Sequence, residues 1–194
     1  MPSWYRGFIQ GKTRIALAWG FVVILVFLTR QYPQWPGLIL CFAGASLRFW
    51  ASGYLRKDNR PAVGGPYSFV RNPLYLGTYL MAVGVSWAIG NTLLLLVVTV
   101  FFAAIYHFII LDEENKLIRI FGAPYLKYCQ VVPRFVPRPC PAKRSALLDI
   151  NPEQQSLCYS WEIAIKNKAY EAYASFVGLL ALLLISAYFW QLIL

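Results

Sequence analysis

TLLLLVVTVFFAAIYHFIIL occupies residues 92–111 and contains no Asp, Glu, Lys or Arg. A helix needs ~20 mostly apolar residues to cross the hydrocarbon core of a bilayer, and this stretch has that length. Four further apolar segments accompany it, at residues 15–29, 37–54, 74–89 and 173–194. The segment at 173–194 is also long enough, whereas the other three reach the required length only if flanking polar or aromatic residues lie at the membrane interface.

The composition agrees with a chain that lies largely in lipid. Of the 194 residues, 59% are hydrophobic and only 13% are charged, against roughly 25% charged in ordinary soluble domains. A chain of this length has room for about one domain. We therefore expect one all-α integral membrane domain over residues 1–194, with about five transmembrane helices.

Lys and Arg are distributed unevenly between the connections of these helices. They precede the first segment, lie between the second and third, and recur between the fourth and fifth from Lys116 to Lys168, whereas Arg30 is the basic residue of the opposite side. Cytoplasmic loops carry the excess of Lys and Arg, so we expect a multi-pass protein with a cytoplasmic N-terminus and a C-terminus on the other side. The net charge of +10 then reflects topology and attraction to anionic lipids, and no nucleic-acid partner is expected.

The four cysteines, Cys41, Cys129, Cys140 and Cys158, are widely spaced in the sequence. Zinc sites and redox motifs usually place two cysteines a few residues apart, and disulfides are rare in the reducing cytoplasm. We therefore expect neither a metal site nor a disulfide framework. The sequence leaves the oligomeric state open.

The first motif, GPYSFVRNPLYLG at residues 65–77, lies in the polar connection before the third apolar segment. Asn72 suits the N-cap of the following helix and Pro73 suits its first turn. The free backbone amides at such a helix start can bind an anion, for example a carboxylate. The alternative is that Asn72-Pro73 serves only to start the helix.

The second motif, EENKLIRIFGAPYLKY at residues 113–128 with VPR at 132–134, follows the fourth apolar segment. We expect the fourth helix to continue to a C-cap at Gly122, and Pro124 to stop further helix. Glu113 and Glu114 are about 100° apart on a helix, so one of them is expected to face a pocket. The alternative is that both are interfacial acids paired with a nearby Lys or Arg.

Together, in this order and at these spacings, the two motifs resemble the isoprenylcysteine carboxyl methyltransferase and phospholipid methyltransferase superfamily. Its pattern is GPY, then R-H-P-x-Y-x-G, then EE-x-x-L-x-x-x-FG-x-x-Y-x-x-Y-x-x-x-VPR. The resemblance covers residues 48–138 as a motif core. A separate C-terminal part, residues 151–194, is expected to form an amphipathic helix from Asn151-Pro152 and then the last span.

This resemblance implies a membrane enzyme that transfers the methyl group of S-adenosylmethionine to a lipid-like acceptor, with S-adenosylhomocysteine as the product. The acceptor would be a prenylcysteine-type carboxylate or a phospholipid amine at the membrane–cytoplasm interface. Asn72 stands where the family has histidine. Because asparagine cannot carry a proton near neutral pH, we expect it to position the cofactor and not to act as an acid or base.

The resemblance also implies a cofactor pocket built from residues of both motifs. From the first motif these are Gly65, Pro66, Tyr67, Val70, Arg71, Asn72, Pro73, Tyr75, Leu76 and Gly77. From the second they are Glu113, Glu114, Leu117, Phe121, Tyr125 and Tyr128. Carboxylates can accept hydrogen bonds from the ribose hydroxyls and the ammonium group, and the tyrosine rings can form a wall for adenine.

Three residues are candidates for catalysis or substrate recognition: Arg48, Arg71 and His107. Arg48 lies inside the second apolar segment, where a charge is costly and usually functional. It can pair with one of the glutamates, meet an anionic substrate head, or extend to the membrane surface. The alternative for Arg71 is that it serves only as one of the cytoplasmic basic residues that set the orientation of the chain. His107 is either a base for a substrate proton or a hydrogen-bonded structural residue.

Two other functions compete with methyl transfer. Membrane sterol-type reductases, which use NADPH, resemble the chain over the R-x-P-x-Y-x-G and FG-x-x-Y-x-x-Y blocks. They are usually longer and carry other acidic pairs, so the chain length and Glu113-Glu114 favour methyl transfer. A non-catalytic membrane scaffold or small transporter would leave both motifs unexplained.

Overall fold

The computed structural model describes residues 20, 25, 27–56, 60–153 and 157–193. Their regular elements, in chain order, are α3 (Trp35–Ser52), the 3₁₀ helix η1 (Gly65–Ser68), α4 (Pro73–Ile89), α5 (Thr92–Phe121), α6 (Ala123–Val131), α7 (Arg144–Ile150), α8 (Trp161–Lys166) and α9 (Tyr170–Ile193). Within this part of the chain no strand is present, which confirms the all-α class. The predicted first span, residues 15–29, lies mostly outside the described residues, as do the basic residues before it.

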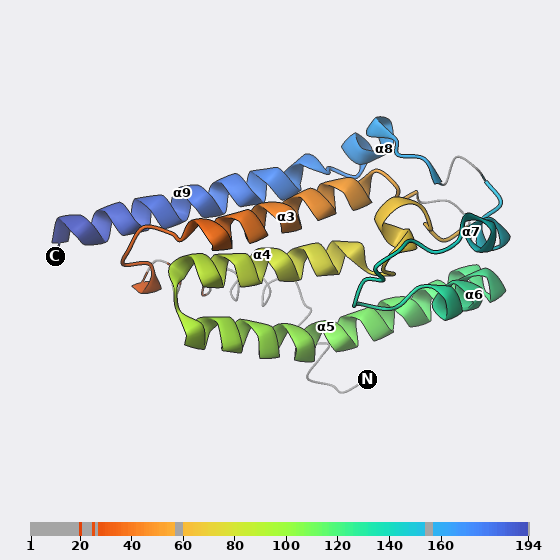
Figure 1. The fold of residues 1–194 in the computed structure, drawn as a ribbon, viewed down its shortest axis with the longest axis horizontal. Coiled ribbons are helices and arrows are strands. Elements are labelled where there is room, and N and C mark those ends of the chain that lie inside the picture. The colour runs from red at the N-terminus through yellow and green to blue at the C-terminus, as the bar shows by residue number, and fades with distance from the viewer. Residues whose placement is uncertain (1–19, 21–24, 26, 57–59, 154–156, 194) are drawn as a thin grey trace.

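The long helices form an elongated bundle. They lie side by side in the order α9, α3, α4, α5, and the short helices α6, α7 and α8 gather at one end (Figure 1). At this end α3 and α5 finish, and α4 and α9 begin. The two sequence motifs therefore meet there, because one precedes α4 and the other closes α5.

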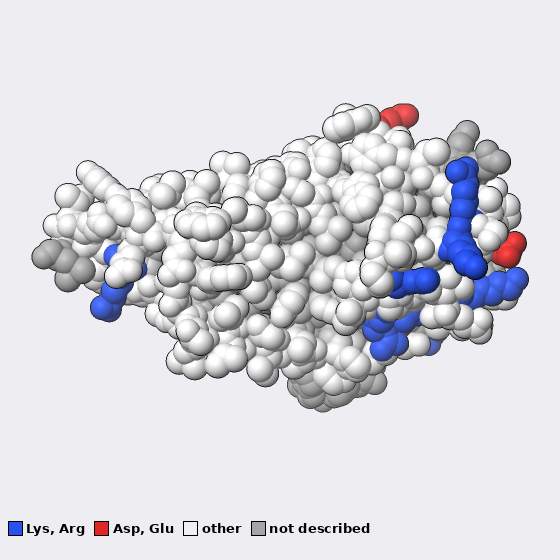
Figure 2. All heavy atoms as spheres, viewed as in Figure 1, with Lys and Arg blue, Asp and Glu red and all other residues white. Residues whose placement is uncertain are grey.

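The surface of α5 and α9 is suited to lipid. Both helices are long and apolar enough to cross a membrane, and only 11% and 17% of their most apolar windows are buried within the protein. Charged side chains gather at the end that carries the short helices, and the middle of the visible face is almost free of them (Figure 2). A membrane protein with two helices of spanning length is thus supported. The crossings of α3 and the shorter α4, and the orientation, stay predictions.

Two pairs of glycines bring α3 and α4 into direct backbone contact. A Cβ added to Gly44 would lie 2.6 Å from the carbonyl oxygen of Gly77, and one added to Gly84 would lie 2.7 Å from that of Gly37. In each helix the two glycines are seven residues apart, so they lie on one face. Small residues allow membrane helices to approach closely, and this contact sets the position of the start of α4.

The start of α4 differs from the prediction in one respect. Asn72 occupies the position before the helix, but its side chain makes no capping hydrogen bond. Its Nδ2 instead donates to the carbonyl oxygen of Arg134 at 2.9 Å. Asn72 is thus the N-cap residue by position and Pro73 lies in the first turn, as predicted, but the predicted side-chain cap is absent and the side chain contacts a residue distant in sequence.

The chain after α5 is also more helical than predicted. Gly122 ends α5 as expected, with a φ of 61°, but Pro124 lies in the first turn of the new helix α6. Proline is tolerated there because its missing N–H has no partner to lose. The expectation that Pro124 stops helical structure was wrong, and α7 was not predicted.

The helix expected from Asn151 begins later in the described residues, at Trp161, where the Ser160 side chain accepts a hydrogen bond from the Ile163 amide. Asn151 is buried, and its Nδ2 donates to the carbonyl oxygen of Pro61 at 3.2 Å. Its side chain therefore joins the C-terminal part of the chain to the segment after α3.

The glycine contact predicts that Gly44→Leu destabilises the protein. The added side chain must push against the backbone of α4, and overpacking of this kind costs about 1–3 kcal/mol or more. Gly178→Leu is the matched control, because a Cβ at Gly178 on α9 has nothing within 4 Å. Thermal unfolding in detergent should show a clearly lower midpoint for the first variant than for the second. Equal midpoints would contradict the contact.

Candidate cofactor site

A cavity of about 420 Å³ lies at the end of the bundle where the two motifs meet. Small-molecule sites usually enclose ~300–1,000 Å³. Its walls come from the segment after α3, the start of α4, the end of α5 and α6. They consist of Leu55, Arg56, Arg60, Pro61, Ala62, Tyr67, Arg71, Asn72, Pro73, Leu74, Tyr75, Glu113, Leu117, Ile120, Phe121, Tyr125 and Tyr128.

Most of the predicted cofactor residues line this cavity. Those that do are Tyr67, Arg71, Asn72, Pro73, Tyr75, Glu113, Leu117, Phe121, Tyr125 and Tyr128. Those that do not are Gly65, Pro66, Val70, Leu76, Gly77 and Glu114. Gly77 instead contacts α3, so helix packing accounts for the glycine at this position.

Other wall residues were not predicted: Leu55, Arg56, Arg60, Pro61, Ala62, Leu74 and Ile120. Residues 55–62 precede the first motif and match no binding motif. Their basic charge indicated only the orientation of the chain in the membrane. Leu74 and Ile120 occupy unspecified positions inside the motifs.

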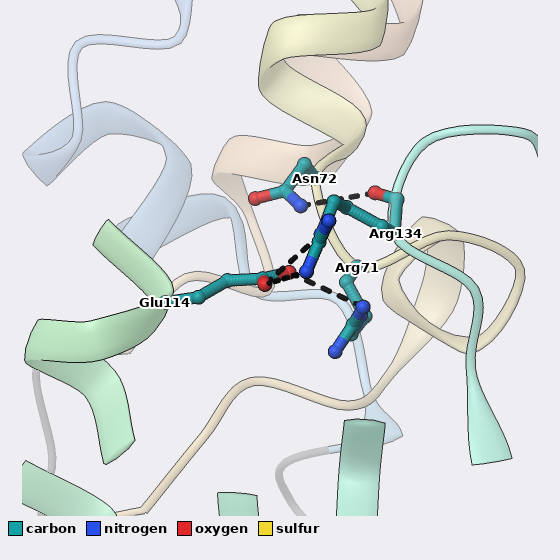
Figure 3. Close-up of polar contacts among 4 residues, drawn as sticks. All are labelled: Arg71, Asn72, Glu114 and Arg134. Carbon is teal, nitrogen blue, oxygen red and sulfur yellow. Dashed lines mark hydrogen bonds and ion pairs between the residues drawn. The ribbon is translucent and has the colours of Figure 1, made fainter. Parts of the chain in front are cut away.

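Glu114 is the buried ionic centre beside the cavity. Only 5% of the residue is exposed. Its Oε2 accepts a hydrogen bond from Arg134 Nε at 3.0 Å and lies 2.8 Å from Arg134 Nη2 (Figure 3). Arg71 Nη2 lies 3.3 Å from Oε1 and forms an ion pair with it. Among the described residues, Oε1 accepts no hydrogen bond. A buried carboxylate needs such partners because leaving water is expensive.

Residues 133–142 are fastened along residues 67–72 by hydrogen bonds. The Arg71 amide donates to the Pro133 carbonyl at 2.8 Å, and the Arg138 amide donates to that of Phe69 at 3.0 Å. The Asn72 side chain adds its bond to Arg134. The proline-rich segment after α6 therefore packs along the residues that lead into α4.

Three buried tyrosines form one side of the site. Burial raises the pKa of the Tyr67 phenol well above its usual range, and the charge of Glu113 raises it further. Burial and then the charge of Glu114 raise the pKa of the Tyr125 phenol, and burial likewise raises the pKa of Tyr128. The Tyr128 hydroxyl donates to the Tyr67 carbonyl at 2.7 Å. These phenols stay protonated at neutral pH and serve as a rigid wall.

Glu113 and Glu114 face different surroundings. Glu113 lines the cavity and accepts a hydrogen bond from the Tyr75 hydroxyl at 2.5 Å, whereas Glu114 is held by the two arginines. The structure thus directs one carboxylate to the cavity and uses the other to join segments.

The three candidates for catalysis are separated in space. Arg71 lines the cavity. Arg48 lines another cavity, where its Nη1 donates to Thr78 Oγ1 at 2.5 Å and to the Leu74 carbonyl at 3.3 Å. Among the described residues no carboxylate forms an ion pair with Arg48, so the suggested pairing with Glu113 or Glu114 is absent. His107 is exposed and lines a groove between α4 and α5.

Comparison with known proteins gives one family and several relatives. Residues 34–124 match the family model described as phospholipid methyltransferase. The protein-S-isoprenylcysteine O-methyltransferase of Schizosaccharomyces pombe is 30% identical over 95 residues, which cover 49% of this chain and 40% of that protein. No solved structure matches.

Two further relatives are named for metal resistance. The cobalt-zinc-cadmium resistance protein CzcN of Cupriavidus metallidurans is 30% identical over 135 residues, 62% of either chain. The nickel-cobalt-cadmium resistance protein NccN of Alcaligenes xylosoxydans xylosoxydans is 28% identical over 129 residues, 60% of either chain. The chain thus spans less than two thirds of the length of these curated relatives.

The buried ion pairs predict that Glu114→Ala lowers the free energy of unfolding by about 3 kcal/mol. Removing one partner of a buried pair leaves an uncompensated charge behind. Asp112→Ala is the matched control, because Asp112 pairs with the exposed Lys116 one turn away and such pairs contribute below about 1 kcal/mol. Chemical unfolding in detergent measures both variants. A loss no larger for Glu114→Ala than for Asp112→Ala would contradict the role assigned to Glu114.

Proposed function

We propose, from the membership of this chain in the isoprenylcysteine carboxyl methyltransferase and phospholipid methyltransferase superfamily, that it transfers a methyl group from S-adenosylmethionine to a lipid-like acceptor. The observation that carries the proposal is the cavity in which both motifs meet, with Glu113 and the buried tyrosines on its wall. The cavity lies at the polar end of the bundle, next to helices with lipid-facing surfaces.

The polar groups on the cavity wall suit the two ends of the cofactor. The Glu113 carboxylate can accept hydrogen bonds from ribose hydroxyls or from the ammonium group. Three cationic side chains, Arg56, Arg60 and Arg71, can attract the carboxylate of the methionine part. Arg71 Nε is buried and makes no hydrogen bond within the described residues, so this side chain has an unused donor.

The apolar and aromatic walls suit the remaining part of the cofactor. Tyr67, Tyr125 and Tyr128 are buried rings on one side, and Leu117 and Phe121 extend the wall along α5. Flat apolar surfaces of this kind favour an adenine base. Asn72 contributes to the wall while its amide holds Arg134, in agreement with a positioning role at this residue.

When bound, S-adenosylmethionine supplies an electrophilic methyl group on a positively charged sulfur. The protein has to align an acceptor atom with that methyl group, because well-oriented reactants gain large rate factors without a strong acid or base. The cavity tyrosines have raised pKa values and stay protonated. Their role is to shape the site and exclude water.

A groove between α4 and α5 provides a place for the lipid chain of the acceptor. It encloses about 280 Å³ and is lined by Tyr79, Thr99, Phe102, Ala103, Tyr106, His107, Ile110, Arg134 and Phe135. Tyr106 packs against Tyr75 with ring centroids 5.4 Å apart, and Tyr75 also lines the cofactor cavity. A lipid in the groove would therefore place its polar end near Arg134 and His107, beside the cofactor. In either proposed acceptor, Arg134 can attract the negatively charged group, the carboxylate of a prenylcysteine or the phosphate of a phospholipid.

The cofactor proposal predicts that S-adenosylhomocysteine binds the purified protein with micromolar affinity, about −8 kcal/mol. Isothermal titration calorimetry in detergent measures this directly, with NADPH titrated under the same conditions. Heat with S-adenosylhomocysteine and none with NADPH is expected. Heat only with NADPH would favour the sterol-type reductase and overturn methyl transfer.

Glu113→Gln should weaken S-adenosylhomocysteine binding by about 1.5–3 kcal/mol, the contribution of a hydrogen bond to a charged group. Tyr75→Phe should weaken it less, because it removes only the hydroxyl that orients the carboxylate. Asp112→Asn is the isosteric control, since Asp112 precedes Glu113 on α5 but does not line the cavity. Unchanged affinity in the Glu113 variant would mean that this acid does not contact the cofactor.

A further inference from the structure

A second polar cavity, of about 340 Å³, lies between the end of α3 and the turn that joins α8 to α9. It shares Leu55 and Leu74 with the cavity proposed for the cofactor, so the two cavities are neighbours. Neither motif contributes to its charged residues. Those are Arg48, Lys166, Lys168 and Glu171.

The cavity has an excess of positive charge. Three cations face it together with one carboxylate, that of Glu171. Lys168 Nζ lies 3.6 Å from Glu171 Oε1, but both side chains are more than 60% exposed, and such pairs contribute little. Arg48 directs Nη1 to Thr78 and Leu74 and has no ion pair among the described residues. An anion would balance these charges.

Lys168 occupies a backbone conformation that glycine would occupy more easily. Its φ is 53°, the one positive value outside glycine among the described residues. The Ala169 amide donates to the Ala164 carbonyl at 2.9 Å, which places Lys168 at the position after the helix end where glycine is favoured. A lysine there costs backbone energy, and strain of this kind favours a functional role for the side chain.

The turn that carries Lys168 is held firmly against α3. Asn167 Nδ2 donates to the carbonyl oxygens of Ser52 at 2.9 Å and Leu55 at 2.7 Å. The two lysines on either side of Asn167 are thereby kept near Arg48, although they are more than a hundred residues away in sequence. Contacts within the protein therefore position this turn beside the end of α3.

The surroundings of the cavity are those of a membrane boundary. Trp161 and Ile165 on α8 are 66% and 65% exposed, and the apolar helix α9 begins at Tyr170. Aromatic residues next to membrane helices collect at the level of the lipid head groups. An anion that reaches this cavity most directly is therefore the phosphate of a lipid.

We propose that this cavity binds the phosphate of a net-anionic phospholipid from the surrounding bilayer. The planar Arg48 fork suits two phosphate oxygens, and Lys166 and Lys168 approach from the membrane surface. This site is separate from the cofactor cavity and does not depend on the proposed methyl transfer. The bound phosphate would link the turn between α8 and α9 to the end of α3 through Lys166, Lys168 and Arg48.

Lipid retention by the purified full chain tests the proposal. Native mass spectrometry from detergent should show short-chain phosphatidylglycerol bound more tightly than short-chain phosphatidylcholine, with inorganic phosphate as a competitor that displaces little of it. Lys166→Ala and Lys168→Gly should each weaken phosphatidylglycerol binding about fivefold, the usual effect of one basic residue near an anionic lipid. Lys127→Ala, an exposed lysine of α6 outside both cavities, is the control and should lose much less.

Lys168→Gly separates binding from folding. Glycine suits a φ of 53°, so this variant should unfold at the same or a higher temperature while it binds the lipid less well. An equal loss in the Lys127 variant would mean diffuse surface attraction and would overturn the site. Equal retention of the two lipids, or efficient displacement by inorganic phosphate, would overturn the assignment to an anionic lipid.

Discussion

One buried carboxylate, that of Glu114, determines how the polar end of the molecule is assembled. A charge that is only 5% exposed requires cationic partners, and its two partners come from separate segments. Arg71 precedes α4, and Arg134 follows α6 (Figure 3). Burying Glu114 at the end of α5 therefore joins three parts of the chain around one point. The cavity that we propose for the cofactor lies beside that point, and Glu113, one residue earlier, lines it.

The position of these charged residues depends on how the long helices α3 and α4 pack against each other. The glycine contacts between α3 and α4 set where α4 begins relative to the end of α3, and the segment after α3 then reaches the cavity wall through Arg56 and Arg60. The same contact places Arg48 against Thr78 on α4. Helix packing in the apolar region thus positions the charges of two neighbouring cavities, for which we propose a nucleoside cofactor and a lipid phosphate.

The sequence predicted those features that depend on local pattern. The apolar run at 92–111 indicated α5, and the family resemblance implied one pocket with Tyr67, Tyr125 and Glu113, which do line one cavity. Features that depend on distant contacts were missed: the Asn72 amide donates to Arg134, and no motif marks the wall residues Leu55, Arg56, Arg60, Pro61 and Ala62. Pro124 was misjudged because proline ends one helix and begins another equally well. Gly77 belongs to the motif but serves the packing of α3 on α4.

The proposed function joins a cofactor cavity with a lipid groove across the contact between Tyr75 and Tyr106. Its central claim is that a methyl group passes from one to the other. The most direct measurement incubates the purified protein with isotopically labelled S-adenosylmethionine and a lipid extract, and follows the label by mass spectrometry. Wild-type protein should place labelled methyl groups on a lipid carboxylate or amine, and Glu113→Gln protein should place far fewer at limiting cofactor. A lipid fraction without label, from protein that binds S-adenosylhomocysteine, would contradict lipid methyl transfer.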